Sequence, residues 1–264
     1  MTLDELKNRV NGIIDPLNGE FAYYIETEEG YIGKNEEKVF PAASLIKLPI
    51  LIEAFRQKEA GLLDLSVPVH INQKDKVGGA GVMNHLSPGA SLTVLDVLTL
   101  MITVSDNTGA NVMIEHAGRE RINALLTELQ CDQTVLKRKL MDFKAIEAGK
   151  NNYTSAKDVV LLLKEIHHGK LLQNESRKTM LDILRNQQFR HKLPGSMDEE
   201  AVIIANKTGE LQGTEHDAAI FEYNGRIIFA VVLTKNLTRE ADARHKLTAV
   251  GTAIQDYLIS VQKN

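Results

Sequence analysis

Residues 214–235 read TEHDAAIFEYNGRIIFAVVLTK and contain the strongest hairpin signal of the chain. Two runs rich in β-branched and aromatic residues flank Asn224-Gly225, a dipeptide that suits the positive φ angles of a tight hairpin turn. A third apolar run, AVIIANKTG at 201–209, comes shortly before them. The sequence therefore predicts a group of consecutive strands near the C-terminal end of the chain.

Strand patterns also occur near the N-terminus, at 20–27 (EFAYYIET) and at 31–33. Because two isolated strands are only marginally stable in water, we expect the first and last strands to share one sheet. Amphipathic helices lie outside these strands in the sequence. One begins at a Thr2/Glu5 capping-box pattern, and the other covers about 239–261.

The middle of the chain, from Ala42 to about Leu184, has helical periodicity. Capping residues and glycines there delimit the expected helices. Their ranges are 44–60, 93–104, 107–117, 119–129, 155–168 and 174–186. Residues 130–153 show no clear periodicity and are expected to form a long loop, which in a compact domain is usually functional.

These patterns predict an α+β fold with an antiparallel sheet flanked by terminal helices and an inserted all-helical domain. The sheet domain is expected to comprise 1–40 plus 195–264, and the helical domain 41–194. We expect the active site in the cleft between them.

The composition narrows the function. The chain has 264 residues, and 31 Lys and Arg against 35 Asp and Glu give a net charge of −4. This balance argues against nucleic-acid binding, which usually needs a basic domain. The single Cys131 excludes an intramolecular disulfide and a cysteine metal cluster. No zinc-protease, dinucleotide or P-loop motif occurs, so we expect neither a metal nor a cofactor.

The cellular compartment is inferred from segments that the sequence lacks. No stretch reaches the roughly 18 consecutive apolar residues of a membrane span. The first residues, MTLDELKNRVNGII, carry acids early and have no apolar core of the kind found in signal peptides. Taken as written, the sequence predicts a cytoplasmic monomer without a membrane span; a secreted protein whose leader has been removed is the alternative.

The first candidate catalytic motif is the tetrapeptide Ser44-Leu45-Ile46-Lys47. Serine is a weak nucleophile until a neighbouring base takes its proton. A lysine three residues later on a helix lies on the same face, one turn away. Ser44, near a helix N-terminus, would also sit among backbone N–H groups that suit a developing oxyanion. In isolation the same motif also fits a capping serine followed by a solvated lysine.

Two further motifs fall at junctions between expected elements. Ser105-Asp106-Asn107 follows an apolar helix, where a hydroxyl and an amide can relay a proton and hold a substrate, although a plain helix cap is the simpler reading. Lys207-Thr208-Gly209 ends a buried strand. Its lysine and hydroxyl can bind a carboxylate, and its glycine lets the backbone approach a ligand closely.

In this order and spacing, the three motifs resemble those of class A β-lactamases and penicillin-binding proteins. The resemblance covers roughly residues 20–260 and is closest to class A enzymes. The text around the second motif is also similar to that family. It includes Gly81-Val82, Leu86, Pro88-Gly89, Leu92-Thr93, Asp96 and the run MITVSDNTGAN at 101–111.

The resemblance implies a β-lactamase-like fold and a role for each motif residue. Ser44 would be the acylated nucleophile and Lys47 its base or proton relay. Ser105 would pass the proton to the leaving nitrogen, and Asn107 would hold Lys47 and the substrate. The remaining implied roles concern substrate binding: a carboxylate pocket at Lys207 and Thr208 beside Gly209, and an oxyanion hole made by the backbone N–H groups of Ser44 and Glu210.

The sequence departs from class A enzymes at the loop that carries their deacylating glutamate. The corresponding residues 136–158, LKRKLMDFKAIEAGKNNYTSAKD, contain no E-x-x-L-N pattern. Asp142 and Glu147 are the only acids between Leu136 and Tyr153. We expect Asp142 to pair with Arg138 or a backbone group and Glu147 to be solvated. A positioned general base typically contributes about 10²–10⁴-fold, so hydrolysis of the acyl-enzyme is expected to be slow.

Three other residues lie near the expected cleft. Glu210 stands where class A enzymes usually have a small residue, and its carboxylate would repel anionic substrates unless it is paired. Arg226 could join the carboxylate pocket, but a surface arginine beside the hairpin is the simpler interpretation. His216 could line the cleft rim, although a structural pairing is the more common role of such a residue.

Three functions remain open at this point. The first is a serine enzyme that hydrolyses β-lactams through acyl-Ser44. The second is a D,D-peptidase-like enzyme acting on peptide-like substrates. The third is a penicillin-binding protein that is acylated once, without efficient turnover, and reports or sequesters antibiotic.

Overall fold

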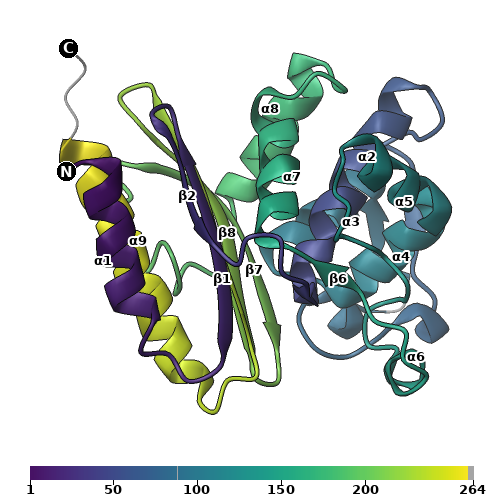
Figure 1. Ribbon diagram of the computed structural model, residues 1–264. Helices are drawn as coiled ribbons and strands as arrows, with labels where there is room; N and C mark the ends of the chain where they lie inside the picture. The colour runs from purple at the N-terminus through teal and green to yellow at the C-terminus, as the bar shows by residue number, and fades with distance from the viewer. Residues whose placement is uncertain (88, 261–264) are drawn as a thin grey trace.

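A computed structural model describes residues 1–87 and 89–260. A five-stranded antiparallel sheet in the order β2-β1-β9-β8-β7 divides the molecule (Figure 1). Its strands are β1 (Glu20–Thr27), β2 (Gly30–Lys34), β7 (Ile203–Leu211), β8 (Thr214–Tyr223) and β9 (Arg226–Lys235). Because β1 pairs with β9, strands from both ends of the chain share one sheet, as the sequence predicts.

Two tight hairpins connect the last three strands. Asn224 and Gly225 have φ angles of 49° and 76°, so the expected turn between β8 and β9 is present. Leu211 pairs with Thr214, so the turn between β7 and β8 also has only two residues. β7 pairs with β8 alone and forms one edge of the sheet.

The terminal helices α1 (Leu3–Ile14) and α9 (Glu240–Ser260) lie side by side and cover one face of the sheet (Figure 1). α1 begins at the expected capping box, where Thr2 and Glu5 exchange side-chain to backbone hydrogen bonds. Apolar side chains from both helices share a core cluster with the sheet. The expected last helix extends to residue 261, which lies outside the described residues.

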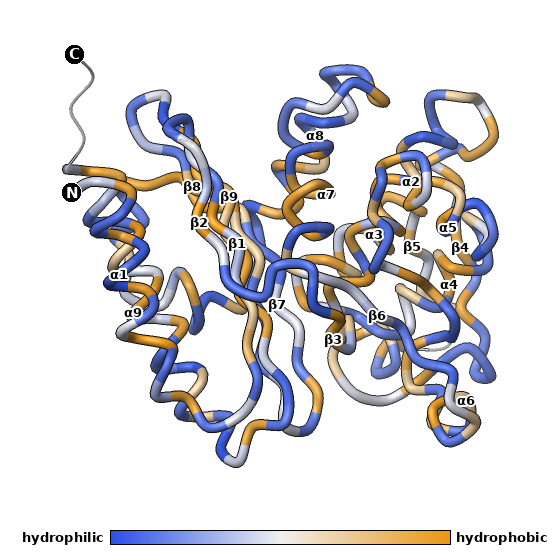
Figure 2. The backbone as a smooth tube through the Cα atoms, in the orientation of Figure 1, coloured by the Kyte–Doolittle hydropathy of each residue, from blue (hydrophilic) through white to orange (hydrophobic). Residues whose placement is uncertain are grey.

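The helices of the middle region lie on the other side of the sheet (Figures 1 and 2). They are α2 (Lys47–Glu59), α3 (Val94–Thr103), α4 (Asn107–Ala117), α5 (Arg119–Glu128), α6 (Phe143–Glu147), α7 (Ala156–His168) and α8 (Asn174–Arg185). α7 packs directly against β1 and β9. Its apolar side chains join those of the sheet and the other helices in one large core cluster.

The middle region also holds short elements that the sequence pattern does not predict. β3 (Phe40–Pro41) pairs with β6 (Tyr153–Thr154), and β4 (Pro68–His70) pairs with β5 (Ser91–Thr93). The expected loop 130–153 contains the short helix α6. Elements this short leave no periodic signal in a sequence. Pro88, part of the text that resembles class A enzymes, lies outside the described residues.

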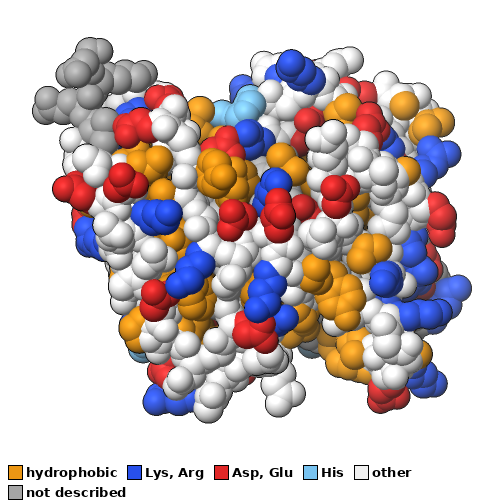
Figure 3. All heavy atoms as spheres, viewed as in Figure 1, with side chains coloured by type: hydrophobic (Ala, Val, Ile, Leu, Met, Phe, Trp, Pro, Cys, Tyr) orange, Lys and Arg blue, Asp and Glu red, His pale blue; other side chains and the backbone are white. Residues whose placement is uncertain are grey.

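Acidic and basic side chains are interspersed over the face drawn in Figure 3. In the described part of the chain, no helix combines the length and apolar character needed to cross a membrane.

Gly251 of α9 allows this helix to approach the segment between α8 and β7. A Cβ at this position would lie 1.8 Å from the backbone carbonyl oxygen of Leu193, whereas a Cβ at Gly12 of α1 would meet nothing within 4 Å. We expect Gly251→Ala to lower the free energy of unfolding by about 1–3 kcal/mol through overpacking. Gly12→Ala should raise it by roughly 0.5–1 kcal/mol. Urea denaturation measures both changes, and similar values for the two variants would contradict this packing.

Candidate active site

Ser44 lies at the junction between β3 and α2, on the short 3₁₀ helix Ala43–Ile46. The preceding Ala43 has a φ angle of 47°, in the left-handed region that residues with a Cβ seldom adopt. Strain of this kind clusters at functional sites. Lys47 is the first residue of α2, so the turn between the two residues brings their side chains to one side.

The Lys47 amine is buried and contacts four oxygen atoms of the site. Its Nζ lies 3.1 Å from Ser44 Oγ and 2.9 Å from Asn107 Oδ1. It also lies 2.6 Å from the backbone oxygen and 3.0 Å from the Oγ of Ser105. Burial lowers the pKa of Lys47 well below its usual 10.5, and the nearby charge of Lys207 lowers it further. Lys47 can therefore be neutral and accept a proton from Ser44.

Ser105 and Asn107 enter the site because the chain turns sharply between α3 and α4. Ser105 has a φ angle of 55°, again in the left-handed region. Asp106 caps α4 with one carboxylate oxygen. Its other oxygen accepts the backbone N–H groups of Val82 and Met83 at 2.6 and 2.7 Å. This buried carboxylate thus fixes the turn and the neighbouring loop, and its role is structural.

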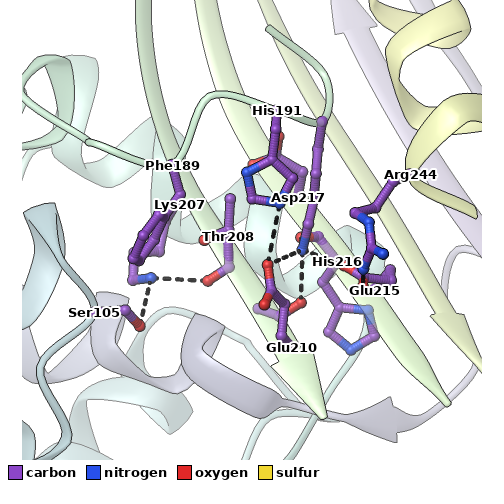
Figure 4. A network of polar contacts seen from close by, with 12 residues as sticks. Ser105, Phe189, His191, Lys207, Thr208, Glu210, Glu215, His216, Asp217 and Arg244 are labelled. Carbon is purple, nitrogen blue, oxygen red and sulfur yellow. Dashed lines mark hydrogen bonds and ion pairs between the residues drawn. The ribbon is translucent and has the colours of Figure 1, made fainter. Parts of the chain in front are cut away.

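Lys207 reaches the same group of atoms from β7. Its Nζ lies 3.0 Å from Ser105 Oγ and 2.8 Å from the backbone oxygen of Thr208 (Figure 4). Burial, and then the charge of Lys192, lower the pKa of Lys207 to about 7. Ser105 Oγ is therefore shared by two lysine amines, which makes a continuous path from Ser44 through Lys47 and Ser105 to Lys207.

These side chains border a cleft of about 350 Å³. Ser44, Ser105, Asn107, Thr208 and Glu210 line it, and Lys47 and Lys207 lie buried behind. The rest of the lining is mainly apolar. It includes Leu140, Met141, Phe143, Ile146, Phe189 and Leu211. The cleft thus combines a polar floor with an apolar wall, a pattern typical of small-molecule sites.

Neither Asp142 nor Glu147 lines this cleft. Asp142 accepts the backbone N–H of Ala145 at 3.0 Å and caps α6, so the expected pairing with a backbone group is present. Glu147 is exposed, as expected. Leu140 of the loop 136–158 lines the cleft wall. The side-chain amide of Asn111 on α4 holds the Leu140 backbone, because it donates to the Leu140 C=O and accepts from the Leu140 N–H. Among the described residues that line the cleft, Glu210 is the one acid.

The Glu210 carboxylate is paired. Oε1 lies 3.0 Å from Lys192 Nζ and 3.4 Å from His191 Nε2. Although burial opposes ionisation, the charge and hydrogen bond of Lys192 and then the charge of His191 leave the pKa of Glu210 below its usual value. Glu210 is therefore an ionised group at the rim, and most of its charge is compensated.

His216 and Arg226 do not belong to the cleft lining. His216 is fully buried, with Nε2 at 2.8 Å from the Pro41 oxygen and Nδ1 accepting the Thr234 N–H. His216 thus holds β3 against the sheet, so its role is the structural pairing named above as the more common one. Arg226 is the first residue of β9, donates to the backbone oxygen of Leu258 on α9, and is buried rather than exposed at the surface.

A second charged group, which no sequence motif predicts, lies behind β7. Lys192 is buried between Glu210 and Glu215. Arg244 of α9 contacts Glu215 (Figure 4). No motif marks these residues, because they come from three separate segments and lack a fixed spacing. Within residues 1–87 and 89–260, no group of three or more His, Cys, Asp or Glu side chains is placed to hold a metal ion.

The fold and the Ser44–Lys47–Ser105 arrangement define a serine acyl-transfer enzyme of the β-lactamase type. The sequence model described as the beta-lactamase enzyme family matches residues 5–258. The chain therefore belongs to this family. It is 25% identical over 206 residues to a β-lactamase of Rhodobacter capsulatus, covering 76% of this chain and 69% of that protein. It is 23% identical over 253 residues to β-lactamase CARB-3 of Pseudomonas aeruginosa, covering 94% and 84%.

Solved structures show the same fold. A β-lactamase from Sphaerobacter thermophilus aligns over all of both chains with a TM-score of 0.89 and 24% identity. PBP-A aligns over 98% of this chain and 97% of its own, with a TM-score of 0.89 and 26% identity. A leucine-to-glutamate variant of PBP-A, also 26% identical, has been solved as an acyl-enzyme complex with penicillin G.

The low pKa of Lys207 predicts a pH dependence for β-lactams that carry a carboxylate. As the pH rises through about 7, Lys207 should lose its proton, and the cleft would then lose the cation expected to bind the carboxylate. The second-order rate constant for acylation by a chromogenic cephalosporin should therefore fall above neutral pH. Lys207→Arg keeps its charge and should remove this fall. A wild-type rate that stays constant on the alkaline side would contradict the assignment.

Proposed function

We propose that this enzyme is acylated by β-lactams at Ser44 and hydrolyses the acyl-enzyme slowly. The observation that carries the proposal is the 3.1 Å contact between Ser44 Oγ and a buried Lys47 amine whose pKa is lowered. A neutral amine at this distance is a general base for the serine hydroxyl. Family membership supports β-lactams as the substrate class.

Acylation follows from the path of contacts. Ser44 Oγ attacks the lactam carbonyl carbon as its proton moves to Lys47 Nζ, and an Oγ–C bond forms. The lactam C–N bond then breaks, and the proton passes through Ser105 Oγ to the leaving nitrogen. The contacts of Ser105 Oγ with both Lys47 and Lys207, each at 3.0 Å, support this route. The backbone N–H groups of Ser44 and Glu210 stabilise the oxyanion.

The cleft also accounts for substrate orientation. Thr208 and Lys207 bind the substrate carboxylate at one end: Thr208 lines the cleft, and the Lys207 amine lies behind it, in contact with the Thr208 backbone oxygen. Asn107 Oδ1 accepts from Lys47, and its Nδ2, 3.2 Å from the Gly78 oxygen, is available to the substrate amide. The exposed side chains of Phe143 and Ile146 on α6 offer an apolar surface to the acyl side chain.

Slow deacylation follows from the residues that the loop 138–146 contributes to the cleft lining. In the described part of 138–146, the side chains that line the cleft are Arg138, Leu140, Met141, Phe143 and Ile146. None of these five is a carboxylate that could activate water. A missing base of this kind costs on the order of 10²–10⁴-fold in rate. The rate of the hydrolytic step should therefore limit turnover.

The second candidate is a penicillin-binding or D,D-peptidase-like protein that is acylated without efficient turnover. The apolar wall at Leu140 favours it, because a wall without a carboxylate lacks a base for the hydrolytic step, whereas the groups proposed for acylation lie elsewhere in the cleft. The likeness to PBP-A gives it further support, because a PBP-A variant has been solved as an acyl-enzyme with penicillin G. The lifetime of acyl-Ser44 separates the two candidates.

Intact-protein mass spectrometry with benzylpenicillin tests the proposal. Wild type should acquire one adduct, located by peptide mapping on the peptide that contains Ser44, and the adduct should persist long after free drug is removed. Ser44→Ala should acquire none. Leu140→Glu places a carboxylate on a backbone that Asn111 holds, facing the cleft. Its adduct should decay at least about 10-fold faster than that of wild type.

Each other outcome has a distinct meaning. Fast wild-type turnover without an adduct would contradict slow deacylation, and replacing Asp142 and Glu147 in turn would then show which acid supplies the base. If wild type shows no adduct and no turnover, this result would contradict β-lactams as substrates. An adduct on Ser44→Ala would contradict the nucleophile. Leu140→Gln is the matched control for Leu140→Glu, because it has the same shape without the charge.

A further inference from the structure

Lys192 is a fully buried lysine that the acylation mechanism leaves without a role. It lies in the segment between α8 and β7 and has an exposure of 0%. Its Nζ lies 3.2 Å from the backbone oxygen of Gly209 and 3.1 Å from that of His216. It also forms ion pairs with Glu210 at 3.0 Å and with Glu215 at 2.6 Å. One cation therefore holds β7, β8 and the rim carboxylate together.

The register of β7 and β8 determines where the Gly209–Glu210 peptide group points. The two-residue turn makes Leu211 and Thr214 a hydrogen-bonded pair, and such pairs alternate along an antiparallel ladder. Gly209 and His216 are therefore the next hydrogen-bonded pair. The Gly209 carbonyl accordingly points toward β8, where Lys192 also contacts it.

The N–H of the same peptide group must point the opposite way. In a trans peptide the C=O and N–H bonds are antiparallel, and no cis peptide occurs in the described residues. The Glu210 N–H is thus directed away from β8, toward the free edge of β7. That edge borders the cleft, because Thr208 and Glu210 line it together with Ser44.

We propose that Lys192 is a positioning residue of the oxyanion hole. Its ammonium fixes the Gly209 carbonyl and the Glu210 carboxylate from behind the strand, and so aims the Glu210 N–H at the carbonyl oxygen of the substrate bound to Ser44. A cation on the carbonyl also polarises the peptide group, which makes its N–H a stronger donor. The proposal rests on acylation of Ser44 as described above.

The surrounding charges are arranged to keep this cation in place. Glu215 is buried and bridges Lys192 and Arg244, with 2.5 Å between the Arg244 and Glu215 atoms. A buried ammonium is tolerated only when it is paired and hydrogen-bonded, and Lys192 meets both conditions. The same cation is the charge that most lowers the pKa of Lys207, so Lys192 acts on both ends of the site.

Four variants isolate this role. Lys192→Arg retains the cation. Lys192→Met combined with Glu215→Gln removes the cation without leaving a buried carboxylate unpaired, and Glu215→Gln alone is its background control. Lys164→Met is the matched control, because Lys164 pairs with Glu26 on the sheet at a site outside the cleft lining. Thermal unfolding of every variant records any loss of fold.

The first readout needs no ligand and therefore does not depend on the proposed function. Amide NMR of the free protein should show the Glu210 proton shifted upfield in Lys192→Met/Glu215→Gln relative to Glu215→Gln. Lys192→Arg should stay close to wild type. The Lys164→Met substitution should leave the chemical shift of the Glu210 amide proton unchanged. An unchanged Glu210 signal in the double variant would overturn the proposal, whatever the stability of that variant.

The second readout is the infrared carbonyl band of the Ser44 ester formed with carbonyl-labelled benzylpenicillin. Loss of a strong donor should move this band to higher wavenumber in the double variant and slow acylation by roughly 10- to 100-fold, part of the effect of removing an oxyanion donor. Lys192→Arg should restore both. Reduced stability with an unchanged band would assign Lys192 a purely structural role. Absence of any ester in wild type would contradict the proposed function, and the amide shift alone would then decide the role of Lys192.

Discussion

The site depends on one constraint, a lysine amine enclosed in the protein with uncharged acceptors. The four oxygen atoms that contact Lys47 Nζ belong to Ser44, Ser105 and Asn107, and none is a carboxylate. A charged amine is costly in such surroundings, which lowers the pKa of Lys47, and the proposed mechanism uses the neutral amine as the base. The strained turns at Ala43 and Ser105 both serve to bring these acceptors to the amine. Removing the enclosure would return Lys47 to an ordinary ammonium and leave Ser44 without a base.

Much of the fold could be predicted from the sequence, because its main elements carry strong local signals. The Asn224-Gly225 turn needs positive φ angles that few other dipeptides supply, and the Thr2/Glu5 capping box marks the start of α1. The pairing of β3 with β6 could not be predicted, since two-residue strands have no periodicity. The helix α6 could not be predicted either, because a helix this short has too few residues for a periodic pattern, and its Asp142 cap is a single residue in a polar loop.

The site was predictable only in part. Ser44, Lys47, Ser105, Asn107 and Lys207 sit in short motifs at element junctions, and the structure brings them together. Lys192 could not be found, because its partners Glu210 and Glu215 become neighbours only when β7 folds back on β8. The hydrogen bonds from the Asn111 side chain to the Leu140 backbone could not be predicted from the sequence either, since they depend on how the loop packs on α4. Residues that act through tertiary contacts leave no spacing in the sequence.

The ionisation of Lys47 is the central claim, and NMR of protein labelled with ¹³C at the lysine Cε measures it directly. The Lys47 signal is assigned as the resonance that disappears in Lys47→Arg, and its chemical shift is followed as a function of pH. The account predicts a titration midpoint well below the usual 10.5, with Lys47 deprotonated in the active enzyme. A midpoint at the usual value would contradict the account, because a protonated amine cannot take the proton of Ser44.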